Sequence, residues 1–190
     1  NEPIHIVVDS TGAKVYGEGE WKVRKHGWSK HRTWKKLHIG IDEKTGHILL
    51  GEVTGNDKTD GEILPALLKQ LTDGTNIGQV SADGAYDQRK CYEALRKRNV
   101  RTIAIPPRHG ARIWNHGNSH GDRHARDENL RRIRKIGRKC WKVEINYHRR
   151  SLSETGMFRL KTIFGDRVSA RTDERQRTQL LLRCYALNKM

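Results

Sequence analysis

Two short segments with the character of strands, each ending at an aspartate, constrain the fold of this chain most strongly. The run Ile4–Val8 precedes Asp9, and the run Gln79–Ala82 precedes Asp83. Short runs of this kind, closed by glycine-containing breaks, are typical of buried strands, and Ser10-Thr11-Gly12 predicts that the first strand stops at Asp9. Open α/β sheets collect their functional groups beyond the carboxyl ends of their strands. We therefore expect both aspartates to belong to one functional site.

Segments with strand and helix periodicity alternate along much of the chain. Leucine and isoleucine recur at helical spacing in residues 60–71, whereas residues 36–42 alternate polar and apolar side chains as half-buried strands do. Strands that run ahead of helices in this way predict an α/β domain with a mixed sheet flanked by helices. The expected elements are a hairpin of residues 36–42 and 47–54, helices over 60–71 (with Thr59 or Asp60 as N-cap) and 87–98, a strand over 101–105, and helices over 147–164 and 173–190.

The formal net charge of +16 is concentrated in the second half of the chain, where residues 101–190 hold 22 lysines and arginines against 8 acidic residues. Residues 22–36 and 131–142 contain no acidic residue, and the first stretch is interleaved with Trp28 and Trp34. Such stretches are typical of nucleic-acid binding, whereas a surface that is merely soluble usually mixes both signs. The candidate DNA-binding residues in these stretches are Lys22, Arg24, Lys25, Arg131, Arg132, Arg134, Lys135, Arg138 and Lys139.

Residues 106–142 are predicted to form a basic insertion. Glycine, histidine and arginine dominate residues 106–139, which predicts a loop-rich or partly disordered segment. Trp114 and Trp141 are candidates for stacking on an unpaired base, although core packing is favoured for Trp141. A zinc site is the less favoured role for the histidines, because Cys140 is the only thiol nearby, and contact with phosphate or solvent is preferred. These histidines are His109, His116, His120 and His124.

Cysteine usage and hydropathy exclude other classes of protein. The three cysteines are widely spaced, which argues against a disulfide framework and fits a reducing cytoplasm. Cys91 and Cys184 lie among apolar residues and are expected to be small core residues. No apolar run approaches the ~18 residues that a membrane span needs, so an integral membrane protein is excluded.

Asp9 and Asp83 are more informative together than separately. Either one alone is better interpreted as the start of a local turn in which its side chain bonds to the backbone. Two carboxylates brought to one site at the ends of two different strands repel each other unless a cation lies between them, and hard divalent metals prefer oxygen ligands. In a basic protein, the pair therefore favours a metal site that acts on phosphodiesters.

The helix expected over residues 147–164 carries a third acidic residue among basic ones. Tyr147, Arg150, Glu154 and Lys161 follow one another at spacings of 3, 4 and 7 residues. At ~100° per residue, all four are predicted to lie within about 60° on one helix face. A face with one acid, two cations and a phenol is not suited to core packing. The alternative is an exposed face with an ion pair between Arg150 and Glu154.

These motifs resemble those of bacterial insertion-sequence transposases of the DDE superfamily. Residues 17–27 and 186–189 are also similar to that group, and the resemblance covers essentially the whole chain. Three separated motifs occur in the family's order. They are Asp9 in Asp-Ser-Thr-Gly, Asp83 in Ala-Asp-Gly-Ala-Tyr-Asp, and Tyr147-x2-Arg150-x3-Glu154-x6-Lys161.

The resemblance implies a ribonuclease-H-like fold and a DNA-cleaving and DNA-joining activity. It implies that the triad of Asp9, Asp83 and Glu154 is catalytic and binds two Mg²⁺ ions, with Mn²⁺ able to substitute. It implies that Tyr147, Arg150 and Lys161 position DNA phosphates near the scissile bond. The implied reaction is cleavage at the element ends, followed by attack of the freed 3′-hydroxyl on target DNA.

The resemblance also implies partners and a location. We expect DNA as substrate, as element ends and as target, with homo-oligomerisation on DNA, no small-molecule substrate, and a cytoplasmic, nucleoid-associated location in bacteria. The family usually carries an N-terminal DNA-binding region, and we expect it to be missing because the chain opens just before the first catalytic strand. The alternatives are a stand-alone nuclease that does not join strands and a non-catalytic remnant. The remnant is disfavoured because all three acids are present.

Overall fold

The protein is described by a computed structural model covering residues 2–15, 34–115 and 123–190. Its centre is a mixed sheet in the order β3-β2-β1-β4-β5, with β6 paired to the far end of β1. Strands β1 to β3 form an antiparallel meander, while β4, β5 and β6 run parallel to their neighbours. The bounds are β1 Ile4–Val15, β2 Trp34–Asp42, β3 Ile48–Thr54, β4 Ile77–Ser81, β5 Thr102–Ala104 and β6 Arg167–Val168.

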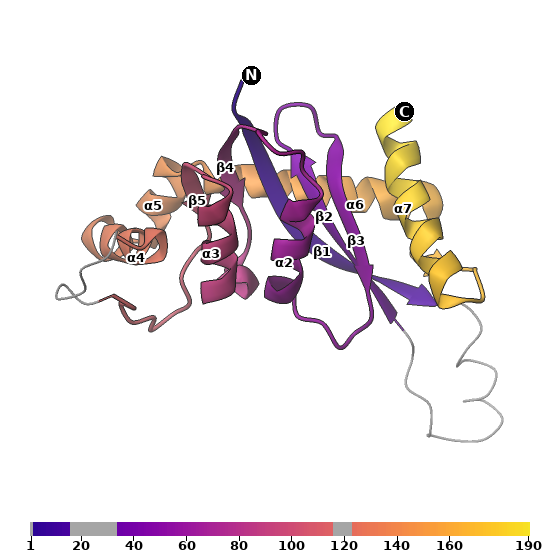
Figure 1. Cartoon of the computed structure of the whole chain (residues 1–190), viewed down its shortest axis with the longest axis horizontal. Helices are drawn as coiled ribbons and strands as arrows, with labels where there is room; N and C mark the ends of the chain where they lie inside the picture. The colour runs from indigo at the N-terminus through magenta and orange to yellow at the C-terminus, as the bar shows by residue number, and fades with distance from the viewer. Residues whose placement is uncertain (1, 16–33, 116–122) are drawn as a thin grey trace.

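Helices cover both faces of this sheet, as Figure 1 shows: α2 and α3 lie in front of it and α6 crosses behind it. The fold class expected from the sequence, a mixed α/β sheet flanked by helices, is confirmed. Among the described helices, none is long and apolar enough to cross a membrane. The bounds are α2 Asp60–Lys69, the 3₁₀ turn η1 Gly84–Tyr86, α3 Arg89–Lys97, α4 Ala125–Ile136, α5 Arg138–Glu144, the 3₁₀ turn η2 Tyr147–Arg150, α6 Ser151–Phe164 and α7 Asp173–Lys189.

The two faces of the sheet carry separate apolar cores. On one face, Ile6 and Val8 of β1 pack with the leucines of α2 and with Cys91 and Leu95 of α3. On the other, the alternate residues of β2 pack against α6 and α7, and Cys184 lies in this second core. Because strand side chains alternate between faces, Asp9 lies on the α6 side, opposite to Val8. The buried positions of Cys91 and Cys184 confirm the roles expected from the sequence.

Strand β1 does not stop at Asp9 as predicted but continues to Val15. Tertiary pairing outweighs the local break, since β2 pairs with β1 from Ile6 as far as Lys14. Gly12 suits this pairing, because a Cβ there would lie 3.3 Å from the ring of Trp34. Asp9 is therefore in the middle of a long strand, at the level where its neighbour β4 ends.

The second half of the insertion is helical, which corrects the prediction of a loop-rich or disordered segment. Helices α4 and α5 occupy residues 125–136 and 138–144. The sequence of α4 suits a helix dipole, with Asp127 and Glu128 in its first turn and Arg134 and Lys135 in its last. The signal was weak because few apolar residues mark the buried side, where Leu130 packs.

The helix predicted over residues 147–164 is divided into two parts. Asn146 adopts a left-handed conformation with φ of 52°, and a short 3₁₀ turn, η2, follows before α6 begins at Ser151. Tyr147 is buried in η2, where its ring lies 6.1 Å from that of Trp141. The prediction that four residues share one helix face therefore applies to Glu154 and Lys161 on α6 and to Arg150 at its N-cap. It does not apply to Tyr147, which lies in η2.

Candidate active site

Asp9 lies on β1, and Asp83 lies just beyond the end of the neighbouring parallel strand β4. In the pairing of β1 with β4, Val7 is opposite Ser81. Asp9 and Asp83 each lie two residues further on, and the charge of Asp83 acts on the carboxyl group of Asp9. In the pairing of β1 with β2, Asp9 is opposite Ile39, which contributes to the core beneath α6. The face of the sheet that carries Asp9 is therefore the one that α6 covers.

The carboxylate of Asp9 is partly enclosed and held by three donors. Its Oδ1 accepts from the backbone N–H of Ser10 at 2.8 Å, and its Oδ2 lies 3.1 Å from both Arg150 Nη1 and Ser153 Oγ. Burial raises the pKa of Asp9 above its usual range and the charge of Asp83 adds to this rise, whereas these three donors oppose it. The two carboxylates are thus close enough to repel each other.

Asp83 also takes the local role considered as the alternative. Its Oδ1 accepts from the backbone N–H of Ala85 at 2.8 Å and so caps the 3₁₀ turn η1. This bond fixes the side chain at the point where β4 has ended. The turn role and the place beside Asp9 are compatible, because a carboxylate has two oxygens and only one is used for the cap.

Helix α6 brings Glu154 to the same region. Ser153, Met157 and Leu160 face the sheet, and Gly156 allows close packing, since a Cβ there would lie 2.5 Å from Ile41 Cδ1. Glu154 follows on the flank of the helix with 60% of its side chain exposed.

Arg150 links the helix to the strand. Its Nη1 lies 3.1 Å from Asp9 Oδ2, and its Nη2 donates to Glu154 Oε1. The guanidinium group therefore lies between two of the three acidic residues predicted from the sequence. Tyr147 borders the same group, with Arg150 6.0 Å from its ring centroid. Burial raises the pKa of Tyr147, so its hydroxyl stays protonated at neutral pH.

The oxygen donors of this region suit a hard divalent cation. Among the described residues, no three histidine, cysteine, aspartate or glutamate side chains already lie close enough together to hold one metal ion. Arg150 accounts for this arrangement, because it neutralises Asp9 and Glu154 in the structure. The carboxylates of Asp9 and Asp83 nevertheless match the preference of Mg²⁺ for oxygen ligands.

Comparison with known protein families decides the classification. The family described as Transposase DDE domain matches residues 1–189. The chain belongs to this family. The α/β architecture with its mixed sheet accordingly corresponds to the ribonuclease-H-like fold that the sequence motifs implied. Members of the transposase DDE domain family are DNA-cleaving and strand-transferring enzymes that use divalent metal ions, so DNA is the substrate class.

The remaining predicted residues of the transposase lie around this centre at different distances. Lys161 is exposed on α6, two turns beyond Glu154, beside Thr11 and Gly12 of β1. It therefore lies on the same helix as Glu154 but not beside Asp9. Lys22, Arg24 and Lys25 lie outside the described residues.

The basic residues of the insertion lie on α4 and α5. Arg131 is paired with Glu128, and Arg132 donates to both oxygens of Glu144. Arg134, Lys135 and Lys139 are exposed, while Arg138 is half-buried. Part of the positive charge of α4 is thus neutralised by nearby glutamates. The remaining positive charge lies in the last turn of α4 and at the start of α5.

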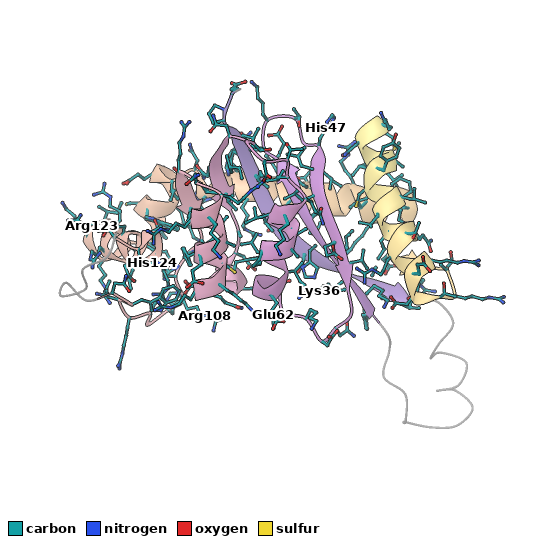
Figure 2. All side chains as sticks on the ribbon, in the orientation of Figure 1. Lys36, His47, Glu62, Arg108, Arg123 and His124 are labelled. Carbon is teal, nitrogen blue, oxygen red and sulfur yellow. The ribbon has the colours of Figure 1, made fainter. Side chains whose placement is uncertain are left out.

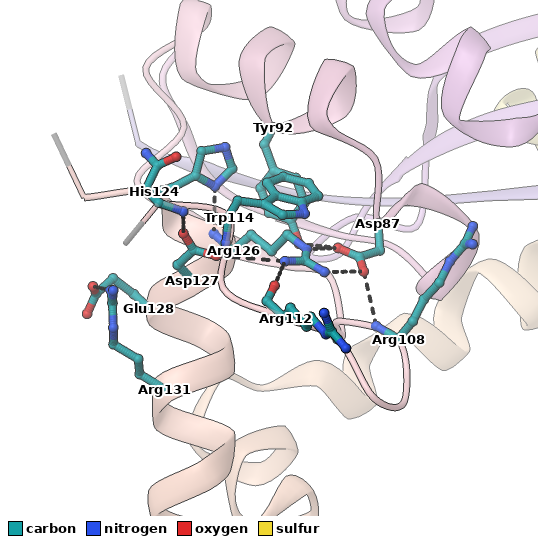
Figure 3. A network of polar contacts seen from close by, with 12 residues as sticks. Asp87, Tyr92, Arg108, Arg112, Trp114, His124, Arg126, Asp127, Glu128 and Arg131 are labelled. Atoms are coloured by element: carbon teal, nitrogen blue, oxygen red, sulfur yellow. Dashed lines mark hydrogen bonds and ion pairs between the residues drawn. The ribbon is translucent and has the colours of Figure 1, made fainter. Parts of the chain in front are cut away.

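A buried ion pair anchors the insertion to the turn that carries Asp83, as Figure 3 shows. Asp87 follows η1, and its carboxylate accepts from Arg126 Nε at 2.6 Å and from the backbone N–H of Arg108 at 3.0 Å. Arg126 also donates to the carbonyl oxygen of Arg112 at 2.9 Å. The side chains of Arg126 and Asp87 are 5% and 1% exposed.

Aromatic rings complete this anchor. The guanidinium group of Arg126 lies 3.9 Å from the ring centroid of Trp114, which makes edge contacts with Tyr92 and His124. His124 caps α4 by accepting from the backbone N–H of Arg126. Figure 2 places Arg108, Arg123 and His124 together near α3 and α4, away from α7. Trp114 thus has a packing role, and Trp141, 2% exposed, lies in the core as favoured.

Two groups of residues in and near the site were not predicted from the sequence. Ser153 donates a hydrogen bond to Asp9. The sequence could have indicated this role only through a small polar residue at a helix position that faces the sheet, and the family motif does not include Ser153. Asp87 and Arg126 form the anchor, but they are 39 residues apart in a stretch with no strong periodicity. Their pairing carries no local signal.

Proposed function

We propose that this transposase domain catalyses metal-dependent cleavage at the ends of its element and transfer of the cut strand into target DNA. The observation that carries this proposal is that Arg150 joins Asp9 to Glu154, while the charge of Asp83 acts on Asp9 from the end of the neighbouring strand. We assign all three acids as catalytic and as the ligands of two Mg²⁺ ions, for which Mn²⁺ can substitute. When bound, such ions activate a water or 3′-hydroxyl and stabilise the leaving oxygen.

The acids differ in how firmly the chain holds them. Both aspartates accept from backbone N–H groups, and Asp9 is also held by the pairing of β1 with β2. Glu154 is on the exposed flank of α6, held by one arginine. In our proposal, the strand carboxylates form the rigid part of the site, and Glu154 completes the ligand set when DNA and metal enter.

Arg150 and Tyr147 are suited to orient a phosphate at this position. An arginine can exchange a carboxylate partner for a phosphate, since both accept its paired N–H groups. Tyr147 keeps its hydroxyl proton because of burial, so the hydroxyl can donate to an oxygen of the scissile phosphate. Lys161, further along α6, contacts the next phosphates of the same strand.

The cations of α4 and α5, most of them exposed, extend this surface. Arg131, Arg132, Arg134, Lys135, Arg138 and Lys139 would contact the flanking duplex, and assembly of two or more copies on DNA would bring two element ends together. Lys22, Arg24 and Lys25 remain predicted contacts.

A nicking assay with a matched control tests the acidic triad. Purified protein is incubated with supercoiled plasmid and Mn²⁺ or Mg²⁺, and conversion to open circles is measured. Glu154→Gln is expected to lower the nicking rate by more than about 100-fold, with salt-sensitive DNA binding retained. The matched control is Glu144→Gln, which neutralises an exposed glutamate of α5 that is paired with Arg132 of α4. This variant should nick DNA like wild type. Full cleavage by Glu154→Gln would reject the assignment.

A strand-transfer assay separates transposition from simple hydrolysis. The substrate is a pre-cut end of the encoding element, labelled at its 3′-hydroxyl strand, with a plasmid as target. Covalent joining of the label to the plasmid is the expected result. Hydrolysis without joining would favour the stand-alone nuclease.

A further inference from the structure

An aromatic side chain stands exposed beside the proposed catalytic glutamate. Phe158 has 69% of its surface exposed, more than Ile163, which is 43% exposed and lies further along α6. The apolar side of this helix is already occupied by its packing against the sheet through Met157 and Leu160. Phe158 therefore contributes nothing to either core, and its exposure needs another explanation.

Helix geometry places Phe158 on the flank that carries the DNA-facing residues. At ~100° per residue, Glu154, Phe158 and Lys161 fall within about 60° of one another. Phe158 is one turn beyond Glu154, about 6 Å along the helix axis. That distance corresponds to roughly two nucleotide steps of ~3.4 Å along one strand.

The charges around the ring favour a nucleic acid as its partner. Arg150 precedes it by two turns, and the exposed Arg159 and Lys161 follow it directly. An apolar protein surface would have to cover these cations, whereas DNA offers phosphates for the cations and flat bases for the ring. A phenylalanine cannot donate a hydrogen bond to a phosphate, whereas the flat face of a base offers its ring a stacking partner.

We propose that Phe158 binds an unstacked nucleobase next to the scissile phosphate, either by stacking on it or by inserting between neighbouring bases. This inference rests on the proposed function, since it assumes that the cleaved strand passes Glu154. In this role, Phe158 is a binding residue that favours locally opened DNA, because a base that is already unpaired costs less to unstack.

Binding to paired and mismatched duplexes tests the inference. Dissociation constants are measured without divalent cations for a fully paired duplex and for the same duplex with two adjacent mismatches, one mismatched base being 2-aminopurine. Wild type should prefer the mismatched duplex by at least about fivefold, the lower end of base–aromatic stacking, and should quench the 2-aminopurine fluorescence. Phe158→Ala should bring the preference close to one, and Phe158→Trp should retain it.

Two controls keep the result specific. Ile163→Ala removes another exposed apolar side chain of α6 and should preserve the preference, and all variants should melt at the wild-type temperature. The inference would be overturned if the Phe158→Ala variant kept the preference for the mismatched duplex, or if it lost affinity equally for both duplexes. Glu154→Gln should retain the preference while losing cleavage. A wild-type protein that shows the Phe158-dependent preference but never nicks DNA would contradict the proposed function alone.

Discussion

Two clusters of this transposase domain are built from the same chemistry, one arginine between carboxylates, yet they differ in exposure. In the anchor cluster, Arg126 joins Asp87 and Asp127, and its side chain is 5% exposed. In the active-site cluster, Arg150 joins Asp9 and Glu154, and its side chain is 22% exposed. Only three residues separate Asp83, in the active-site region, from Asp87, in the anchor.

The two clusters differ in how many of the hydrogen bonds that each carboxylate can accept are made within the protein. Both oxygens of Asp87 accept hydrogen bonds from Arg126, and Oδ2 also accepts one from the backbone of Arg108. Asp127 accepts from two backbone N–H groups in the same way. A buried ion pair with all its hydrogen bonds made is strongly destabilised when one partner is removed. The active-site cluster, which is open to solvent and holds two repelling carboxylates, can instead exchange its partners.

Removal of the anchor carboxylate should have the largest effect on stability. Asp87→Asn leaves Arg126 charged and buried, and we expect a loss of about 3–5 kcal/mol in the free energy of unfolding, measured by urea denaturation. Asp73→Asn, which alters an aspartate with a fully exposed side chain paired with Arg98, is the matched control and should change little. Equal stability of Asp87→Asn and wild type would show that the anchor is not structural.

Removal of one exposed cation beyond the anchor should affect DNA binding alone. Lys135→Gln is expected to weaken binding to any duplex sequence and to reduce the slope of log affinity against log salt by about one, as for the loss of one phosphate contact. The measurement is a salt titration by fluorescence anisotropy. Unfolding by urea should be unchanged, because the side chain is exposed. An unaltered slope would place the DNA path elsewhere.

Protonation of the α4 cap should give the smallest effect. Burial lowers the pKa of His124 from 6.5, so between that lowered value and 6.5 the unfolded chain binds more protons than the folded one. Stability should therefore rise with pH through this window and level off above 6.5. His124→Asn keeps a capping side chain and should remove this part of the pH dependence, measured by thermal unfolding. Identical pH profiles for both proteins would contradict the assignment.

Local sequence patterns were sufficient to predict those elements whose signals lie within a few consecutive residues. The hairpin, α2 with its Thr59 cap, and the strands that precede Asp9 and Asp83 follow from short runs of strand- or helix-forming residues and their breaks, whereas the family resemblance was needed to place these two strands side by side. These signals arise from alternation and capping within a few residues.

What could not be predicted depends on distant contacts. Strand β1 extends beyond its break because β2 pairs with it. Helices α4 and α5 depend on packing and on the pairing of Arg126 with Asp87, which a mainly polar sequence does not reveal. Arg150 reaches Asp9 across 141 residues, so the family motif predicted its importance but not its partner.

Thermal unfolding with and without Mn²⁺ tests the central claim most directly, because it compares two aspartates of one turn. Wild type should be stabilised by the ion, by about 2.7 kcal/mol at a hundredfold excess over the dissociation constant. Asp83→Asn should melt near the wild-type temperature without Mn²⁺ but show a strongly reduced shift with it. Asp87→Asn should melt well below wild type and keep the full shift. A full Mn²⁺ shift in Asp83→Asn would contradict the account.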